Sequence, residues 1–180
     1  MITAKDILDF WFNPENKAFW FAKSDDFDEK LRLNFQDIFM QACKAELWSW
    51  RSTAEGRLAE VIILDQFSRN LYRDDPRAFA QDPMALVLSQ EAIELGMDQQ
   101  LAPEWRSFLY MPFMHSESAL IHEQALTLFE KLGNPVNLDF EIRHKVIIDR
   151  FGRYPHRNQV LSRTSTAEEL EFLRQPNSHF

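Results

Sequence analysis

The chain has 180 residues, the length of about one typical domain, and its formal net charge is −8. It contains only 4 glycines, and valine, isoleucine and threonine together number 20, whereas leucine, alanine and glutamate together number 50. So few turn-forming and β-branched residues exclude a β-sandwich, a barrel and a glycine-rich nucleotide fold. The acidic balance argues against general binding to nucleic acid or anionic membranes, because the summed field repels polyanions. We therefore predict a single all-α domain over residues 1–180, with neither nucleic acid nor membrane as a partner.

The cellular compartment is inferred from one cysteine and from the N-terminal segment. Cys43 has no second cysteine with which to form an internal disulfide, which favours a reducing compartment. The segment 1–12 carries Asp6 and Asp9 within its apolar stretch and has no basic lead, so it lacks the pattern of a signal peptide. No run of about 18 apolar residues exists, which excludes a transmembrane helix. We therefore expect a cytoplasmic protein.

Helix start and stop signals divide the chain into segments. Thr3 with Asp6, and Thr166 with Glu169, have the spacing of capping boxes. Gly96 stands where a left-handed residue commonly ends a helix. Short connectors are typical of antiparallel helical hairpins, although no period of about 34 residues marks a solenoid. The signals predict about eight helices, over Thr3–Phe12, Asp25–Leu47, Ser52–Tyr72, Asp82–Gly96, Pro103–Pro112, His115–Leu132, Asp139–Phe151 and Ala167–Arg174.

The first polar cluster continues directly from an apolar run. Val61–Leu64 are four adjacent apolar residues that cover every face of a helix, which predicts that this helix is central and buried. Asp65 with Arg69, and Gln66 with Asn70, then lie four residues apart on common faces. Buried polar groups need partners. The cluster is therefore either one wall of a pocket or a polar helix end with a surface ion pair.

The second polar cluster lies where Pro112 ends or kinks one helix and another begins. The free backbone N–H groups of a helix start attract anions, and His115 with Glu117 can transfer protons near neutral pH. The alternative is structural: Ser116 or Glu117 caps the helix and His115 forms a fixed hydrogen bond. The neighbouring pair His122 and Glu123 lacks the spacing of a metalloprotease motif.

The third cluster lies in the segment 143–163, which has six lysines and arginines against one aspartate and so carries +5, while the remainder carries −13. Gly152 ends the preceding helix and Pro155 fixes the backbone, which holds the side chains on a tight turn. Guanidinium forks suit carboxylates and phosphates, but like charges this close also need anionic partners. Those partners are an anionic ligand, an external acidic protein surface, or internal acids such as Asp65 and Glu117. The cluster consists of His144, Arg150, Arg153, His156, Arg157 and Asn158.

The strings "LDQFSRN", "FLYMPFMHSE", "RFGRYPHRN" and "RTSTAEELEFL", in this order, resemble the bacterial family known as domain of unknown function 924. The resemblance runs from "DILDFWF" nearly to the end of the chain. It implies an all-helical fold similar to tetratricopeptide-repeat (TPR) proteins, with no established activity, substrate or cofactor. Tyr154 stands where phenylalanine is familiar in the family, and Ser162 where glycine is. The family's recurring polar positions fall on Asp65, Gln66, Arg69, Asn70, His115, Ser116, Glu117, His144, Arg150, Arg153, His156, Arg157 and Asn158.

The first functional hypothesis is a polar pocket that binds a small anionic carboxylate or phosphate and that can act as a catalytic site. In this hypothesis His115, Glu117 and His156 transfer protons. The three clusters must then meet in one enclosed cavity, with Asp65 and Glu117 close to the arginines of residues 150–157. The ligand-binding side chains are Asp65, Gln66, Arg69, Asn70, His144, Arg150, Arg153, Arg157 and Asn158.

The second hypothesis is a TPR-like scaffold that binds a peptide or protein partner in a groove. This hypothesis rests on fold analogy alone. Polar residues spread along an open groove favour it. A metal site made of His115, Glu117, His144 and His156 is disfavoured because none of their spacings repeats a known ligand pattern, and we expect no cofactor. The oligomeric state stays open, because the 24 aromatic residues suit an interface as well as a core.

Overall fold

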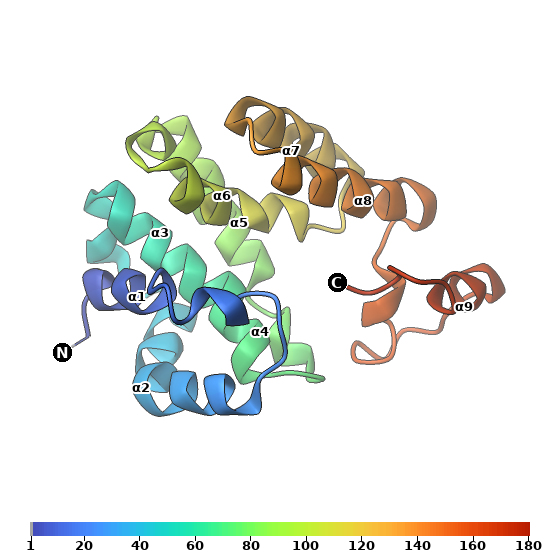
Figure 1. Ribbon diagram of the computed structural model, residues 1–180, viewed down its shortest axis with the longest axis horizontal. Coiled ribbons are helices and arrows are strands. Elements are labelled where there is room, and N and C mark those ends of the chain that lie inside the picture. Colours follow the sequence, from blue (N-terminus) through green and yellow to red (C-terminus); the bar gives the residue numbers. More distant parts are fainter. Residues whose placement is uncertain (1) are drawn as a thin grey trace. The chain divides into compact units, whose positions relative to one another are not determined.

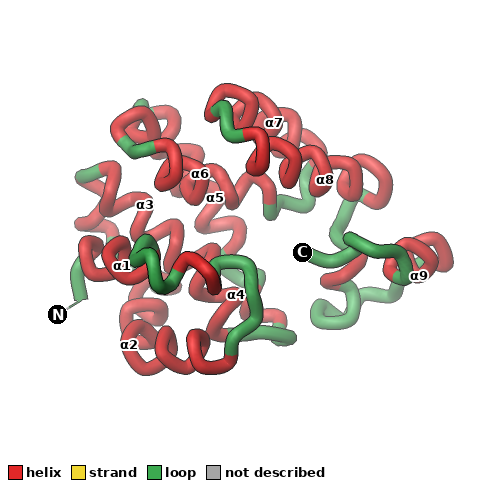
Figure 2. The backbone as a smooth tube through the Cα atoms, viewed as in Figure 1, coloured by secondary structure: helices red, strands yellow, loops and turns green. Residues whose placement is uncertain are grey.

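The computed structural model describes residues 2–180, so Met1 of the segment 1–12 lies outside the described residues (Figure 1). Helices account for 70% of the chain, and no strand occurs within residues 2–180 (Figure 2). The predicted all-α class is confirmed, while the TPR-like stacking stays a prediction. Every helix in this range is also too short or too polar to cross a bilayer.

The chain forms two compact units. The first contains the residues up to Arg73 together with Arg77–Pro112, and the second contains Asp74–Pro76 and Phe113–Phe180. The prediction of one domain over residues 1–180 is not tested by this division. The first unit holds α1 (Ala4–Trp11), α2 (Asp25–Cys43), α3 (Ala54–Ile62), α4 (Ser68–Leu71), α5 (Asp82–Glu94) and most of α6 (Pro103–Met114). The second unit holds α7 (Ala119–Leu132), α8 (Pro135–Phe151) and α9 (Ala167–Leu173).

A continuous helical rod lies at the centre of the first unit. It consists of α3, a π-helical segment over Ile63–Phe67, and α4, which follow one another without a break. With these counted as one, residues 2–180 contain eight helices, in agreement with the sequence. Every residue from Gly56 to Ser68 is buried, because α1, α2 and α5 all contact the rod. The prediction that Val61–Leu64 belong to a central buried helix is confirmed.

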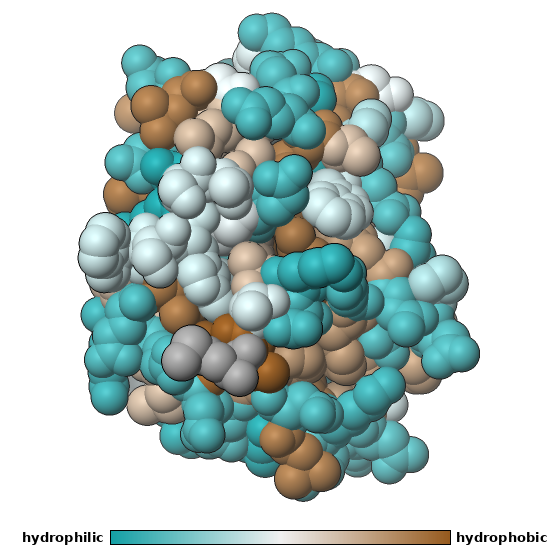
Figure 3. Space-filling view, turned by 90° about the vertical axis from the view of Figure 1, so that its left-hand side faces the viewer, coloured by the Kyte–Doolittle hydropathy of each residue, from teal (hydrophilic) through white to brown (hydrophobic). Residues whose placement is uncertain are grey.

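Aromatic side chains fill the core of the first unit. Trp11 is fully buried, and its ring lies edge-on to Phe108 with 5.7 Å between the ring centroids. Phe67, on the central rod, lies 5.7 Å from the same ring. All five tryptophans of the chain belong to this unit, although Trp48 is exposed. On the face seen in Figure 3, hydrophilic side chains cover most of the surface and strongly apolar ones form small, separate groups.

Two helix boundaries in the first unit differ from the sequence-based prediction. The helix predicted to reach Leu47 ends at Cys43, because Ala45 adopts a left-handed backbone with φ of 57° and reverses the chain. The N-cap of α3 is Thr53 instead of Ser52, and its side chain accepts a hydrogen bond from the Gly56 N–H.

Three further boundaries differ around the second unit. Pro112 does not end the helix, since it lies in the last turn of α6, which continues to Met114. The next helix begins at Ala119 and not at His115, so His115 and Glu117 lie in a connector, without the helical register expected for them. Helix α8 begins at Pro135 and not at Asp139. Asn134 caps this earlier start by accepting hydrogen bonds from two backbone N–H groups, and Pro135 occupies the first turn.

Candidate functional site

The first polar cluster forms an ion-paired network within the first unit. Asp65 is fully buried on the π-helical segment, and its Oδ2 accepts a hydrogen bond of 2.6 Å from the Gln66 amide. Arg69 donates to the Asp65 carbonyl at 2.7 Å and forms two hydrogen bonds of 2.8 and 2.9 Å with Asp82. Gln66 also approaches the Met111 sulfur at 3.5 Å. The ion pair of Asp65 and Arg69, at 3.4 Å, is partly buried: the Asp65 side chain is 1% exposed and that of Arg69 is 21% exposed.

Asn70 faces a different neighbour, the N-terminal part of α2. Its amide donates to Asp28 Oδ1 at 2.8 Å, and Arg73 donates two further hydrogen bonds to the same carboxylate. Asp28 is itself buried, so these three donors stabilise its charge. The role of Asp65, Gln66, Arg69 and Asn70 in ligand binding stays a prediction.

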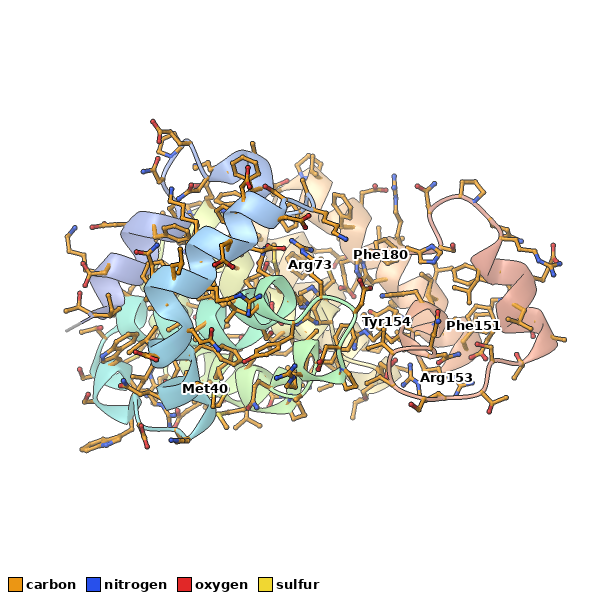
Figure 4. The ribbon with its side chains drawn as sticks, turned by 90° about the horizontal axis from the view of Figure 1, so that it is seen from below. Met40, Arg73, Phe151, Arg153, Tyr154 and Phe180 are labelled. Atoms are coloured by element: carbon orange, nitrogen blue, oxygen red, sulfur yellow. The ribbon has the colours of Figure 1, made fainter. Side chains whose placement is uncertain are left out.

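Tyr154, labelled in Figure 4, lies in the turn after α8. The second and third clusters meet around it. Tyr154 is fully buried, and its hydroxyl donates to the Met114 carbonyl at 2.5 Å. Four basic side chains surround its ring. The guanidinium carbon of Arg157 lies 4.6 Å from the centroid of the Tyr154 ring. The ring centroids of His144 and His156 both lie 5.7 Å from the same point, and that of His122 lies 6.3 Å from it.

His144 is a neutral imidazole with a fixed tautomer. Its Nδ1 lies 2.7 Å from the Phe140 carbonyl, and because a carbonyl only accepts, Nδ1 carries the proton and Nε2 presents a lone pair. Burial lowers the pKa of His144 to about 3, with a smaller lowering from the neighbouring histidines. The ring of Phe180 stacks on the imidazole, with 3.8 Å between centroids and 27° between planes. His115 lies 6.4 Å away on the same measure.

Arg157 is held in place by two contacts within the second unit. It is 6% exposed, its Nη2 donates to the His115 carbonyl at 3.0 Å, and its guanidinium lies over the Tyr154 ring. His156 precedes it and lies 6.1 Å from His179 between ring centroids. The predicted residues His144, His156 and Arg157 thus gather around one buried tyrosine, and His115 lies next to His144.

A buried pair that the sequence did not indicate lies beside this group. His122 Nδ1 is 2.7 Å from Glu141 Oε1, and both side chains are fully buried. His122 Nε2 lies 2.8 Å from the Ser116 carbonyl, so Nε2 carries a proton. Burial raises the pKa of Glu141, and the hydrogen bond from His122 lowers it by a smaller amount, so the pKa stays above its usual value. The signal that could have found the pair is Glu141 itself, a charged residue one turn before His144 on the buried face of α8.

Glu117 anchors the turn as an ionised carboxylate. It accepts hydrogen bonds from the Tyr154 N–H at 2.7 Å and from Arg163 at 2.7 and 2.9 Å. Burial alone raises the pKa of Glu117, but the hydrogen bonds from Arg163 and Tyr154 outweigh it and leave the pKa below its usual value. A group that stays ionised near neutral pH is a poor proton donor but can still accept a proton, so the catalytic role of Glu117 stays a prediction.

The other arginines of the basic segment bind acids of the second unit. Arg153 forms two hydrogen bonds with Glu169 at 2.7 and 2.8 Å, and Arg150 pairs with the exposed Glu168 at 2.8 Å. Asn158, fully buried, donates to Ser165 Oγ at 3.0 Å. The +5 segment is therefore compensated by α9 and Glu117, which confirms an internal salt-bridge network for these arginines.

Within residues 2–180, no group of three or more histidine, cysteine, aspartate or glutamate side chains could hold a metal ion.

Comparison with other proteins places the chain among uncharacterised bacterial sequences. A family model described as "Bacterial protein of unknown function (DUF924)" matches residues 7–177. The chain is also similar to a solved structure, the protein of unknown function ATU0120 from Agrobacterium tumefaciens. The two sequences are 38% identical over 95% of this chain and 96% of that one, and the TM-score is 0.89. A search of curated proteins gave no match.

Proposed function

Because the chain belongs to the DUF924 family of bacterial proteins of unknown function, we propose a role from its own residues: the second unit binds a small anionic molecule at Arg157. The ligand is a carboxylate or a phosphate. The observation that carries the proposal is the gathering of Arg157, His144 and His156 around the buried Tyr154, with His115 next to His144.

Arg157 supplies the anion-binding group. A guanidinium is always charged and presents planar donors that match carboxylate and phosphate oxygens. A surface arginine loses side-chain entropy when it binds, but Arg157 is already ordered by the His115 carbonyl and the Tyr154 ring. This preorganisation distinguishes it from Arg150, which is exposed and paired with Glu168.

The histidines supply acceptors and exchangeable protons. His144 is held neutral with its Nε2 lone pair unprotonated, so it can accept a hydrogen bond from a ligand hydroxyl or from a protonated acid. His115 and His156 are the proton-transfer groups of the proposal. Glu117, Arg153 and Asn158 instead hold the turn in shape through the salt-bridge network, whereas Arg150 forms only an exposed pair with Glu168. We keep the cytoplasmic location, inferred from the single Cys43, as part of this proposal.

The test is a thermal-shift and calorimetric titration with acetate, phosphate and citrate against sodium chloride at matched ionic strength. An anion that binds only the folded protein raises Tm with concentration. We expect Arg157→Lys to weaken binding about tenfold, because it loses one charge-assisted hydrogen bond of about 1.5 kcal/mol. The matched control, Arg150→Gln, removes a guanidinium of the same segment and should leave binding unchanged.

Two outcomes contradict the proposal. One is that no anion stabilises the protein beyond chloride. The other is that Arg150→Gln weakens binding as much as Arg157→Lys, which means that the anions respond only to the summed positive charge. In either case a helical scaffold that binds a peptide or protein becomes the better explanation.

A further inference from the structure

An aromatic ring covers one face of the proposed site. Phe180 stacks on His144 at 3.8 Å and lies 6.4 Å from His156 between ring centroids (Figure 4). Its segment turns back at Asn177, whose φ is 62°, and is fastened by the buried Ser178, which donates to the Leu173 carbonyl at 3.2 Å. A short turn therefore places the phenyl ring against the histidines.

The ring of Phe180 is only partly buried. It is 46% exposed, whereas His144 beneath it is 6% exposed. Because the stabilisation from burial scales with the area removed from water, a half-exposed ring is held more weakly than a core side chain. Phe180 can therefore leave while His144, fixed by the Phe140 carbonyl, keeps its orientation.

The place that the Phe180 ring fills on His144 is called the ring slot here. The flat face of His144 forms its floor, and the ring of His144 meets Tyr154 at 83°, an edge-to-face arrangement. Arg157 lies over the same Tyr154 ring, so the slot and the guanidinium share one neighbour. Burial keeps His144 uncharged, which suits stacking against a neutral ring.

We propose that this slot binds the planar ring of an aromatic acid, and that Phe180 occupies it in the free protein. The inference rests on the proposed function, because Arg157 binds the acid group of the same ligand. It narrows the ligand class from small anions in general to anions that carry a flat aromatic ring.

The test compares three probes of similar charge and different shape: acetate, benzoate and cyclohexanecarboxylate. Each is titrated into the wild-type protein, Phe180→Ala and Leu170→Ala, and the imidazole signals are followed by NMR. Leu170 is the matched control, because it is an apolar residue of the same unit, on α9, with 51% exposure. In the absence of probe, Phe180→Ala should shift the His144 signals by removal of the ring current, while Leu170→Ala should not.

An occupant that fills the slot in about 90% of molecules lowers the apparent affinity of a competitor about tenfold. We therefore expect Phe180→Ala to bind benzoate about tenfold more tightly than the wild type does. The affinity for acetate should be unchanged, and cyclohexanecarboxylate should gain much less than benzoate. Leu170→Ala should match the wild type for all three probes.

Each contrary result has a distinct meaning. If acetate and benzoate bind but their affinity ratio is the same in the wild type and in Phe180→Ala, the ring slot is wrong and the anion site stands. The slot is equally wrong if benzoate binds less tightly to Phe180→Ala, if cyclohexanecarboxylate gains as much as benzoate, or if the His144 signals do not shift. If no probe binds any of the three proteins, the slot is wrong, and the proposed function fails as well if phosphate and citrate do not bind the wild type.

Discussion

At the residue scale, the hydroxyl of Tyr154 connects three segments of the second unit. It donates to the Met114 carbonyl and lies 3.1 Å from His122 Nε2, which also contacts the Ser116 carbonyl.

We expect Tyr154→Phe to fold and to lose about 1–2 kcal/mol of unfolding free energy, because the Met114 carbonyl loses a buried donor while His122 keeps the Ser116 carbonyl. Urea unfolding followed by circular dichroism measures the loss. Tyr154→Ala is the companion variant and should cost about 3–5 kcal/mol, since it removes a buried ring. Equal losses in the two variants would show that the hydroxyl, and not the ring, holds the turn.

Glu169 gives the second unit a pH-dependent stability. Hydrogen bonds from Arg153 lower the pKa of Glu169 to about 2 from its ordinary 4.5, against the opposing effect of burial. Its contribution is therefore complete above about pH 4.5 and is lost as the pH falls towards 2. A shift of this size corresponds to about 3 kcal/mol, which solvent screening reduces to about 2 kcal/mol.

We expect Glu169→Gln to lose about 2 kcal/mol at pH 7 and to show a flatter stability curve between pH 4.5 and 2 than the wild type. Equilibrium unfolding at several pH values measures both effects. The control is Glu168→Gln, which breaks the exposed pair with Arg150 and should cost at most about 0.5 kcal/mol. A wild-type curve that keeps its full stability at pH 2 would refute the role of Glu169.

At the element scale, the first turn of α3 depends on a glycine. A Cβ atom placed on Gly56 would lie 2.0 Å from the Trp50 carbonyl oxygen and 2.9 Å from Thr53 Oγ1. Both neighbours are constrained, because the Trp50 carbonyl is backbone and Thr53 is the N-cap of the helix. The close approach places the short turn over Trp48–Ser52 directly against the central rod.

We expect Gly56→Ala to destabilise the protein by about 3 kcal/mol, although glycine to alanine inside a helix ordinarily stabilises by about 0.4–1 kcal/mol. A loss of unfolding free energy where a gain is usual is the diagnostic result, and urea unfolding measures it. Glu55→Ala is a suitable control, because its side chain is exposed on the same turn. A gain in stability for Gly56→Ala would mean that the Trp50 carbonyl moves aside at little cost.

The element scale also shows how far the sequence determines the fold. The capping boxes of Thr3 and Thr166 are confirmed because all their hydrogen bonds are local, between residues three apart. The predicted start of α8 at Asp139 is four residues too late, although Asn134 followed by Pro135 is itself a start signal. The π-helical turn at Ile63–Phe67 had no such signal, since its residues are equally compatible with an α-helix.

The candidate site was predicted only in part, for a related physical reason. The residue types on the turn from Arg150 to Asn158 indicated its chemistry, and three of the predicted residues, His144, His156 and Arg157, do surround Tyr154. The choice of partner, however, depends on where the chain folds back. Glu168 and Glu169 bind Arg150 and Arg153, and the pair His122 and Glu141 forms across α7 and α8. Spacing along the sequence does not determine such pairs.

At the scale of the whole molecule, core residues and site residues should respond differently to truncation. Ile62→Ala removes a fully buried side chain of the central rod and should cost about 2–5 kcal/mol. Arg157→Ala should cost less, since the guanidinium is proposed to serve a ligand. Thermal melts of the two variants give the comparison. If Arg157→Ala unfolds the protein as severely as Ile62→Ala, the arginine belongs to a structural network and the anion site loses its main support.

The segregation of aromatic residue types gives each unit its own spectroscopic reporter. All five tryptophans belong to the first unit, and all five histidines, from His115 to His179, belong to the second. Indole fluorescence therefore follows the unfolding of one unit, and imidazole proton resonances follow the other, without any added label. The difference between their two midpoints in urea measures how cooperatively the units unfold.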